Sequence, residues 1–315
     1  MSGSTDNITE EEAAADVLCC ASCGIAEVDN VKLKPCDGCD LDLARYCSDE
    51  CQQDHWPEHE AKCTERAAEL RDELLFRQPE SSHLGDCPIC CLPLGLSLGF
   101  STDLSKTAIY PCCSTWICKG CAYANDLRQR REKMQGTCPF CRHPHPKTME
   151  EVEKKLMKRV AANDPDAMRQ IGFMRFGGKE YNAAFEYFTK AAELGDADGH
   201  FLLSFAYGEG LGVEKDEERE LYHLEEAAIR GHPSARYNLG NHEARNERFE
   251  RAVKHYIIAA NLGFNDSTTV LKEYYKNGHV SKEDFAAALR AHQAAVNATK
   301  SPQREAAEKD GVKWR

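Results

Sequence analysis

The placement of the cysteines constrains the fold of this chain more than any other feature. All seventeen lie between Cys19 and Cys141, and residues 142–315 contain none. Most form closely spaced pairs, a pattern typical of structural zinc sites in which thiolates and imidazoles surround the ion tetrahedrally. We therefore predict a multidomain protein in which two small zinc-stabilised modules precede a part that folds without metal.

Composition excludes several classes of protein. No stretch approaches the ~18 consecutive apolar residues of a membrane span, so we expect no membrane segment. The first basic residue is Lys32 and no apolar core precedes it, which fits neither a secretory signal nor a transit peptide. The expected location is cytoplasmic or nuclear, where thiols stay reduced and bind metal. A formal charge of -12 disfavours nucleic acid as a partner.

Changes in composition along the chain predict its domain boundaries. The expected segments are a disordered acidic tail (1–17), a first cysteine module (18–63), a helical linker (64–85), a second cysteine module (86–146), a connecting helix (147–162), helical repeats (163–300) and a C-terminal tail (301–315).

The first cysteine module offers eight zinc ligands in four pairs, enough for two ions. They are Cys20, Cys23, Cys36, Cys39, Cys47, Cys51, His59 and Cys63. His55 is a rival of His59, but only His59 has the three-residue gap to Cys63 that one helical turn requires. The stretch from Tyr46 to Cys63 resembles the MYND zinc finger. The resemblance implies interleaved sites, with Cys20, Cys23, Cys47 and Cys51 on one ion and Cys36, Cys39, His59 and Cys63 on the other.

MYND modules typically bind short proline-containing peptides, and the matching pattern places Gln52 and Trp56 one helical turn apart. An exposed indole beside an amide suits a proline ring and a peptide group. The alternative is that Trp56 packs inside the small core.

The second cysteine module reads Cys87-x2-Cys90, Cys112-Cys113, Cys118-x2-Cys121 and Cys138-x2-Cys141, and it resembles a RING finger. The usual histidine before the third pair is missing, which indicates an all-cysteine variant. Adjacent Cys112 and Cys113 can share an ion if the chain turns there, because consecutive Cα atoms and two zinc-bound sulfurs are both ~3.8 Å apart. The expected sites are Cys87, Cys90, Cys118 and Cys121, and then Cys112, Cys113, Cys138 and Cys141.

The chain would then bind four structural Zn²⁺ ions as its cofactors, with Cys19 and Cys91 left as spare or alternative ligands. Replacement of Cys90 by Cys91, or a contribution from His143 to the second site, stays open.

Resemblance to the RING finger implies a function in ubiquitin transfer. In that family, the positions of Ile89 and Pro139 bind a ubiquitin-conjugating enzyme, and a cationic residue at the position of Arg142 positions ubiquitin. A planar guanidinium suits a bridge between two carbonyl-rich surfaces. Alternatively, Arg142 simply offsets the negative charge of the neighbouring zinc-bound thiolates.

The cysteine-free part contains an internal repeat, because Ala-Ala-x-x-Gly recurs with its glycine at Gly195, Gly231 and Gly263. A fixed register follows Asn163 and each of these three glycines. Small residues come after four positions (Ala167, Gly199, Ala235 and Ser267) and large aliphatic residues after eight (Ile171, Leu203, Leu239 and Leu271). A two-helix unit of ~34 residues predicts an all-α solenoid. The pattern resembles Sel-1-like repeats, which are related to tetratricopeptide repeats, over about 160–300, with a degraded fourth copy.

The second copy of the repeat contains three closely spaced glycines. Gly208, Gly210 and Gly212 are expected to form the turn between its two helices. The aromatic residues of the repeats are expected to pack between helices: Phe185, Tyr187, Phe188, Tyr222, Tyr237 and Tyr256.

These features lead to one functional hypothesis and one alternative. The hypothesis is a RING-type ubiquitin ligase that orients a charged conjugating enzyme, while the MYND module and the repeats recruit protein substrates or proline-containing peptides. The alternative is a non-enzymatic scaffold whose zinc modules and repeats only bind proteins.

Overall fold

The computed structural model describes residues 20–23, 33–36, 44–95 and 106–310. It divides into two compact units, Met1–Leu74 and Leu75–Arg315, which are considered separately. The predicted disordered tail, residues 1–17, lies outside the described residues. No helix of the described ranges is both long enough and apolar enough to cross a membrane.

The first unit is a hairpin and a helix around a small core. Strands β1 (Lys34–Pro35) and β2 (Arg45–Tyr46) pair antiparallel, and helix α1 (Asp49–Leu75) follows. The buried core consists of three cysteines and three other side chains: Cys20, Leu33, Cys36, Ala44, Tyr46 and Cys63. So little apolar area fits a module that depends on metal for its stability.

Helix α1 differs from the predicted boundaries in two ways. It continues through residue 63 without a break, because no helix-breaking residue separates the predicted ligand His59 from Leu75. The predicted helical linker, 64–85, is helical only to Leu75. A polar stretch with Pro79 and the left-handed Gly85 follows as irregular chain.

The second unit begins with the second cysteine module. Strands β3 (Thr107–Tyr110) and β4 (Thr115–Cys118) form an antiparallel hairpin, and α2 (Lys119–Arg131) starts directly after it. Ile117 and Ala122 are fully buried among the cysteines of the module. The hairpin and the helix thus place four cysteine pairs around one compact core.

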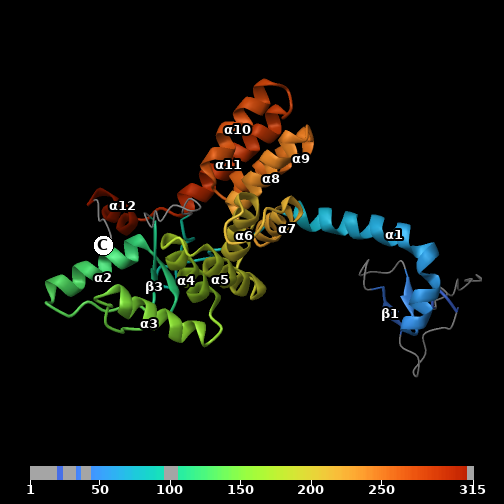
Figure 1. Cartoon of the computed structure of the whole chain (residues 1–315). Helices are drawn as coiled ribbons and strands as arrows, with labels where there is room; N and C mark the ends of the chain where they lie inside the picture. Colours follow the sequence, from blue (N-terminus) through green and yellow to red (C-terminus); the bar gives the residue numbers. More distant parts are fainter. Residues whose placement is uncertain (1–19, 24–32, 37–43, 96–105, 311–315) are drawn as a thin grey trace, which may run out of the picture. The chain divides into compact units, whose positions relative to one another are not determined.

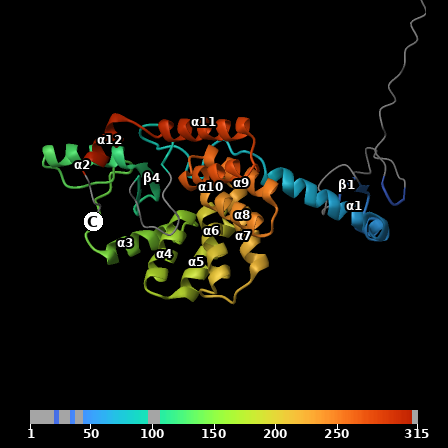
Figure 2. The ribbon, with the colours of Figure 1, turned by 90° about the horizontal axis from the view of Figure 1, so that it is seen from above.

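The remaining helices form the predicted all-α solenoid. They are α3 (Met149–Val160), α4 (Pro165–Gly177), α5 (Tyr181–Glu193), α6 (Ala197–Glu209), α7 (Glu217–Ile229), α8 (Pro233–Arg245), α9 (Phe249–Asn261), α10 (Asn265–Lys276) and α11 (Lys282–Ala298). Each packs mainly against its neighbours in sequence, which gives the stack from α4 to α11 in Figures 1 and 2.

The predicted register describes the interior of this stack. The small residues Ala167, Ala235 and Ser267 have no exposed area, and Gly199 is also buried. The large residues one turn later are at most 2% exposed: Ile171, Leu203, Leu239 and Leu271. Of the predicted core aromatics, Phe188 and Tyr256 are buried. Tyr222 is 53% exposed, so its assignment to the core is wrong.

Glycines mark the turns where the backbone is left-handed. Gly195, Gly231 and Gly263 follow α5, α7 and α9 with φ of 85°, 83° and 87°, which end the helices as predicted. In the second copy, Gly210 caps α6, and a Cβ at Gly212 would collide with the backbone of Tyr181. Gly208 lies inside α6 and not in the predicted turn.

The predicted C-terminal tail contains one more helix, α12 (Pro302–Lys309). Ser301 caps its first turn by accepting a hydrogen bond from the backbone N–H of Arg304 at 3.3 Å. Helix α12 packs on α2 of the second cysteine module, beside which it lies in Figures 1 and 2. The end of the solenoid therefore returns to the module at its beginning.

Candidate metal centres and docking surfaces

Four cysteines of the first module meet at one point. The Sγ atoms of Cys20, Cys23, Cys47 and Cys51 all lie within 4.8 Å of one another. Cys47 is 3.6 Å from both Cys23 and Cys51. Sulfurs bound tetrahedrally to zinc at ~2.3 Å are ~3.8 Å apart, so the spacing of this group fits a zinc ion.

A second group in this module joins Cys36, His59 and Cys63, with the two sulfurs 3.6 Å apart. The predicted fourth ligand, Cys39, lies outside the described residues. His59 is buried, and burial lowers its pKa, assisted by the charges of His55 and Lys62. A neutral imidazole with a free lone pair is the form that binds zinc.

His55, the rival ligand, lies elsewhere. Its Nδ1 is 3.0 Å from the hydroxyl of Tyr46, and its ring stacks on that of His59. It supports the ligand His59 from the side and is not part of either group. The pairing of sites implied by the MYND resemblance is the one in which the described ligands come together.

The first group of the second module consists of Cys87, Cys90, Cys118 and Cys121. The sulfurs of Cys90 and Cys118 are 3.7 Å apart. Two backbone N–H groups point at the sulfurs: Cys118 donates to Cys87 and Cys121 donates to Cys118, each at 3.4 Å. Such donors stabilise thiolates. The start of α2 therefore favours the metal-binding form of this group.

The second group consists of Cys112, Cys113, Cys138 and Cys141. Cys113 and Cys138 are 3.8 Å apart, and Cys112 and Cys141 are 3.3 Å apart. The required turn is present: the backbone N–H of Ser114 donates to the carbonyl of Tyr110 at 2.8 Å, and Ser114 has φ of 51°. Adjacent cysteines therefore reach one point without a histidine.

The two groups alternate along the chain, since the first and third pairs form one and the second and fourth pairs form the other. Among the described residues, neither Cys91 nor His143 belongs to a group. Cys91 is exposed, with left-handed φ of 52°. Cys19 lies outside the described residues.

The predicted docking residues of the second module share one groove. A cavity of about 550 Å³ beside α2 is lined by Ile89, Pro139 and Arg142. Ile89 lies in the loop between Cys87 and Cys90, and the other two lie in or directly after the loop between Cys138 and Cys141. Ile89 is 44% exposed, and Met134, on the same groove, is 50% exposed. Large apolar side chains exposed together are typical of a protein-binding surface.

In the first module, Trp56 is 37% exposed and packs edge-on against His59. The amide of Gln52 donates toward the sulfur of Cys36 at 3.8 Å. Trp56 thus contacts the predicted ligand His59 while part of its indole faces solvent. Gln52 contacts the predicted ligand Cys36.

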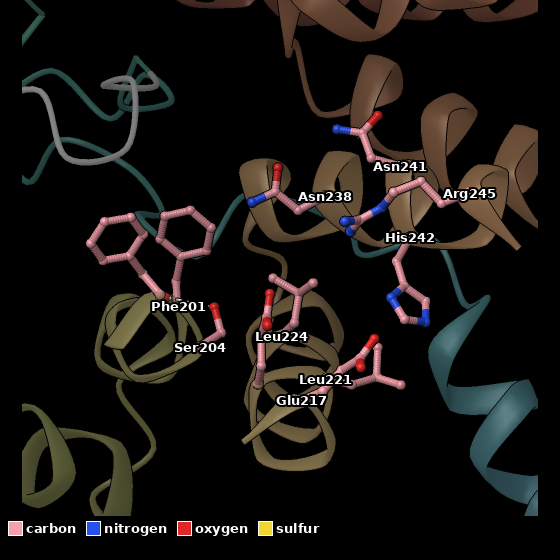
Figure 3. Close-up of a pocket in the computed structure, with 11 residues that line it drawn as sticks. Phe201, Ser204, Glu217, Leu221, Leu224, Asn238, Asn241, His242 and Arg245 are labelled. Carbon is pink, nitrogen blue, oxygen red and sulfur yellow. Dashed lines mark hydrogen bonds between the residues drawn. The ribbon is translucent and has the colours of Figure 1, made fainter. Parts of the chain in front are cut away.

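The solenoid carries a second groove, of about 510 Å³, between α6, α7 and α8. In Figure 3, Phe201 and Leu224 form its apolar end, while Glu217 and the side chains of His242 and Arg245 lie toward the other. Such a mixed lining can bury an apolar anchor and pair with polar groups around it. The sequence analysis did not identify these residues, because it does not show which faces of α6, α7 and α8 line a groove.

A fifth group of possible ligands, His83, Asp198 and His232, is better explained by hydrogen bonding. The Nδ1 of His232 accepts from the backbone N–H of Ala235 at 3.2 Å, so its Nε2 carries the proton and donates to Asp198 at 3.2 Å. A protonated nitrogen has no lone pair for a metal. His83 contacts the same carboxylate oxygen at 3.1 Å.

This group extends into a partly buried ion network around the buried Arg169. Arg169 contacts Asp166, Asp196 and Asp198. Burial opposes the ionisation of Asp198, but Arg169 and the hydrogen bonds from His83 and His232 outweigh it and hold its pKa well below the usual range. The ordinary sequence spacing of these residues gave no signal of a network.

Comparison with known families identifies two of the three parts. The MYND finger family matches residues 20–63, and the Sel1 repeat family matches 165–196, 197–232 and 233–264. The cysteine clusters, together with the MYND finger, indicate zinc binding. These families do not include the second cysteine module, and the fourth helix pair, α10 and α11, lies beyond the matched repeats.

Individual relatives match only parts of the chain. The chitin synthase regulator SKT5 of Saccharomyces cerevisiae is 40% identical over 65 residues, which are 21% of this chain and 9% of the yeast protein. Among solved structures, a Sel1 repeat protein from Oxalobacter formigenes has 23% identity and a TM-score of 0.43 over 55% of this chain and 52% of its own.

A protective antigen of uropathogenic Escherichia coli that displays an SLR fold has 23% identity and a TM-score of 0.38, over 54% of this chain and 38% of its own. The family matches are therefore more informative than the individual relatives. They establish that residues 20–63 are a MYND finger and that residues 165–264 are three Sel1 repeats.

Proposed function

We propose that the chain is a protein-binding scaffold whose second cysteine module acts as a RING-type ubiquitin ligase. The observation that carries this proposal is the shared groove of Ile89, Pro139 and Arg142, which come from two different cysteine loops. The alternating arrangement of the two cysteine groups also supports it, because this is how a RING finger binds its ions. The proposed reaction is the transfer of ubiquitin from a conjugating enzyme to a protein.

Within this proposal, the module acts by orientation and contributes no nucleophile. Ile89 and Pro139 bind the conjugating enzyme through apolar contacts. Arg142, which is exposed at the rim of the groove, hydrogen-bonds ubiquitin and the enzyme together, so that the thioester is held ready for attack by a substrate amine. Restricting this otherwise mobile thioester lowers the entropic part of the barrier.

The zinc ions serve as structural supports, and we propose four per chain. Three complete groups of four cysteines and the group of Cys36, His59 and Cys63 account for them, with Cys39 as the last ligand. Elemental analysis of the purified protein should give four zinc ions per chain. A content of two or three would contradict at least one of the groups.

Substrate recruitment is assigned to the MYND finger and the Sel1 repeats. In the MYND finger, Trp56 and Gln52 would bind a proline-containing peptide. Trp56→Ala should abolish that binding with the zinc content unchanged, because the indole is partly exposed. Loss of zinc together with binding would instead indicate that Trp56 mainly supports His59.

Two substitutions test the ligase at different steps. Ile89→Ala removes an exposed apolar anchor and should weaken binding of the conjugating enzyme by more than ~1 kcal/mol. Arg142→Ala should preserve most of that binding but slow discharge of ubiquitin, because its contact matters once ubiquitin is attached. Both should keep the full zinc content, since neither residue is a ligand.

The alternative is a scaffold without ligase activity, acting as a regulator. The name of the yeast relative, a chitin synthase regulator, favours this alternative, although the chain covers 9% of that protein. The deciding experiment uses zinc-loaded wild-type protein and a broad panel of charged conjugating enzymes. If it neither binds nor discharges any of them, the ligase proposal is wrong and the scaffold function replaces it.

A further inference from the structure

The groove of the second cysteine module has a fourth side, which comes from the C-terminal helix. Gln303 of α12 lines the same cavity as Ile89, Pro139 and Arg142. Its side chain is exposed and makes no hydrogen bond with any residue that the structure describes. The amide of Gln303 is therefore free to bind a partner that enters the groove.

The next residue, Arg304, joins α12 to the loop that carries Ile89. Arg304 is only 9% exposed. Its Nη1 donates to the carbonyl of Pro93 at 2.7 Å, and its Nη2 donates to the carbonyl of Leu92 at 3.1 Å and toward the sulfur of Cys90 at 3.5 Å. The rigid guanidinium fork fixes all three positions together, so Arg304 positions the loop just after Ile89.

Close backbone packing shows that α12 is built into the module. A Cβ at Gly120, in the first turn of α2, would lie 2.7 Å from the backbone nitrogen of Arg304. Ala307, one turn later, has no exposed area. At the far end, the hydroxyl of Tyr123 donates to Asp310. Only a glycine at residue 120 allows the two helices to approach so closely.

Charge defines the partner that fits this groove. Arg128 and Arg142 are both exposed in its lining, and none of the described lining residues carries a carboxylate. The exposed apolar side chains of Ile89 and Met134 line the same cavity. The lining therefore complements a protein loop that carries an apolar anchor flanked by acidic groups.

We infer that α12 is part of the docking surface for the charged conjugating enzyme, with Gln303 in direct contact and Arg304 as a positioning residue for Ile89. This inference rests on the proposed ligase function. It adds a partner-contacting residue from a part of the chain about 160 residues beyond the module's last cysteine, and it selects conjugating enzymes whose docking loop is acidic.

Opposite charges at residue 303 test the contact. Gln303→Glu should weaken binding of the conjugating enzyme by about fivefold, and Gln303→Lys should strengthen it by a similar factor, because a surface charge acts on an acidic loop at short range. Both effects should shrink at high salt. Glu308→Gln, on an exposed position of the same helix, serves as the control and should bind like the wild type.

Arg304 is tested by zinc release as well as by binding. Arg304→Met should weaken binding and release zinc to a chelating dye severalfold faster than wild type, and Arg304→Lys should restore part of both. Equal release rates for Arg304→Met and wild type would overturn the positioning role, whether or not binding falls.

The outcomes separate this inference from the ligase proposal. If the wild type binds a conjugating enzyme but Gln303→Glu and Gln303→Lys bind equally well, only the docking role of α12 is overturned. If zinc-loaded wild-type protein binds none of the panel, the ligase proposal and the docking role are both wrong.

Discussion

At the scale of single residues, the solenoid depends on small side chains that face large rings. Gly172 in α4 lies against Phe188, and Gly240 in α8 lies against Tyr256. Each glycine follows directly after a buried aliphatic residue of the repeat register, Ile171 or Leu239. The missing Cβ provides the space for the ring from the next helix, so packing outweighs the poor helix propensity of glycine at these positions.

Gly240→Ala should therefore destabilise the solenoid although alanine favours helix. Its Cβ would lie 2.5 Å from the ring of Tyr256, which is buried and whose hydroxyl donates to Asn241 at 2.9 Å. We expect a loss of about 1–3 kcal/mol in urea unfolding followed by circular dichroism. Gly177→Ala is the control, because a Cβ there meets no atom within 4 Å. Equal stability of the two variants would contradict this packing.

Buried histidines should make the solenoid sensitive to acid. Burial lowers the pKa of His200 from 6.5 to about 4, and the charges of Arg230 and His223 act in the same direction, against Glu226. In the unfolded chain His200 is therefore protonated near pH 6.5, whereas in the folded chain it is protonated only near pH 4. Stability is complete above the higher value and is lost as the pH falls through this window.

His200→Gln should reduce the loss of stability between about pH 7 and pH 5 by roughly 1–2 kcal/mol, since glutamine does not titrate. The measurement is urea unfolding of wild type and variant at both pH values. His232, whose pKa burial and the charge of His83 lower to about 4, should preserve part of the dependence in the variant. Identical pH dependence of the two proteins would contradict the assignment to His200.

Sequence reasoning reached many of these residues and missed others for physical reasons. The register of Ala167 and Ile171 was predictable because a repeated period reveals which face is buried. Tyr222 was misassigned because aromatic composition alone does not distinguish an inner from an outer face. Arg169 was missed because two of the three carboxylates around this buried arginine, Asp196 and Asp198, come from the start of another helix.

At the scale of elements, α12 shows what local signals can and cannot predict. Ser301 and Pro302 form a typical helix start, with a capping hydroxyl and a proline at the first position. This signal was present in the sequence and could have predicted the helix. Its packing on α2 could not be predicted, because it depends on contacts of Arg304 with a loop more than two hundred residues earlier.

Removal of zinc should affect the elements unequally. The two cysteine modules have small cores in which half of the buried residues are cysteines, so chelation should unfold β1, β2, β3 and β4 and the part of α1 that carries His59. Helices α3 to α11 contain no cysteine. Circular dichroism after chelation should therefore show that most of the helical signal remains, with a cooperative thermal transition. Complete loss of helix would contradict this division.

At the scale of the whole molecule, the network around Asp198 joins the second cysteine module to the first repeats within the second unit. Trp116 of β4 donates through its indole N–H to Asp166 of α4 at 2.8 Å, and Arg169 lies over the same indole at 5.3 Å. His83, before the second cysteine module, contacts Asp198 of α6. The network therefore fixes the cysteine module on the first repeats, so the proposed ligase groove and the solenoid groove are parts of one folded unit.

Such an arrangement could not be predicted from sequence, because its members are spread from His83 to His232 and none belongs to a motif. Each of them is an ordinary polar residue in the local pattern. Only the fold brings one cation, three carboxylates and two imidazoles to one partly buried cluster, where an unpaired charge would be costly.

Removing the charge of Asp198 should loosen the contact between the second cysteine module and the repeats. Asp198→Asn preserves the shape of the side chain but leaves buried Arg169 and the pair His83 and His232 without their shared carboxylate. Breaking a buried pair costs about 3–5 kcal/mol, so urea unfolding should show a large loss of stability. Asp266→Asn, exposed in the first turn of α10, is the matched control and should cost less than ~1 kcal/mol.

Hydrogen exchange locates the effect of this change. In Asp198→Asn, exchange should rise in residues 81–85 and in β4, because these segments reach the solenoid through His83 and Trp116, while α9 to α11 should keep wild-type protection. Trp116→Phe, which removes the indole N–H and part of the ring that Arg169 covers, should produce the same pattern to a smaller extent. Uniform exchange across the unit, or equal stability of Asp198→Asn and Asp266→Asn, would mean that apolar packing and not this network holds the cysteine module on the repeats.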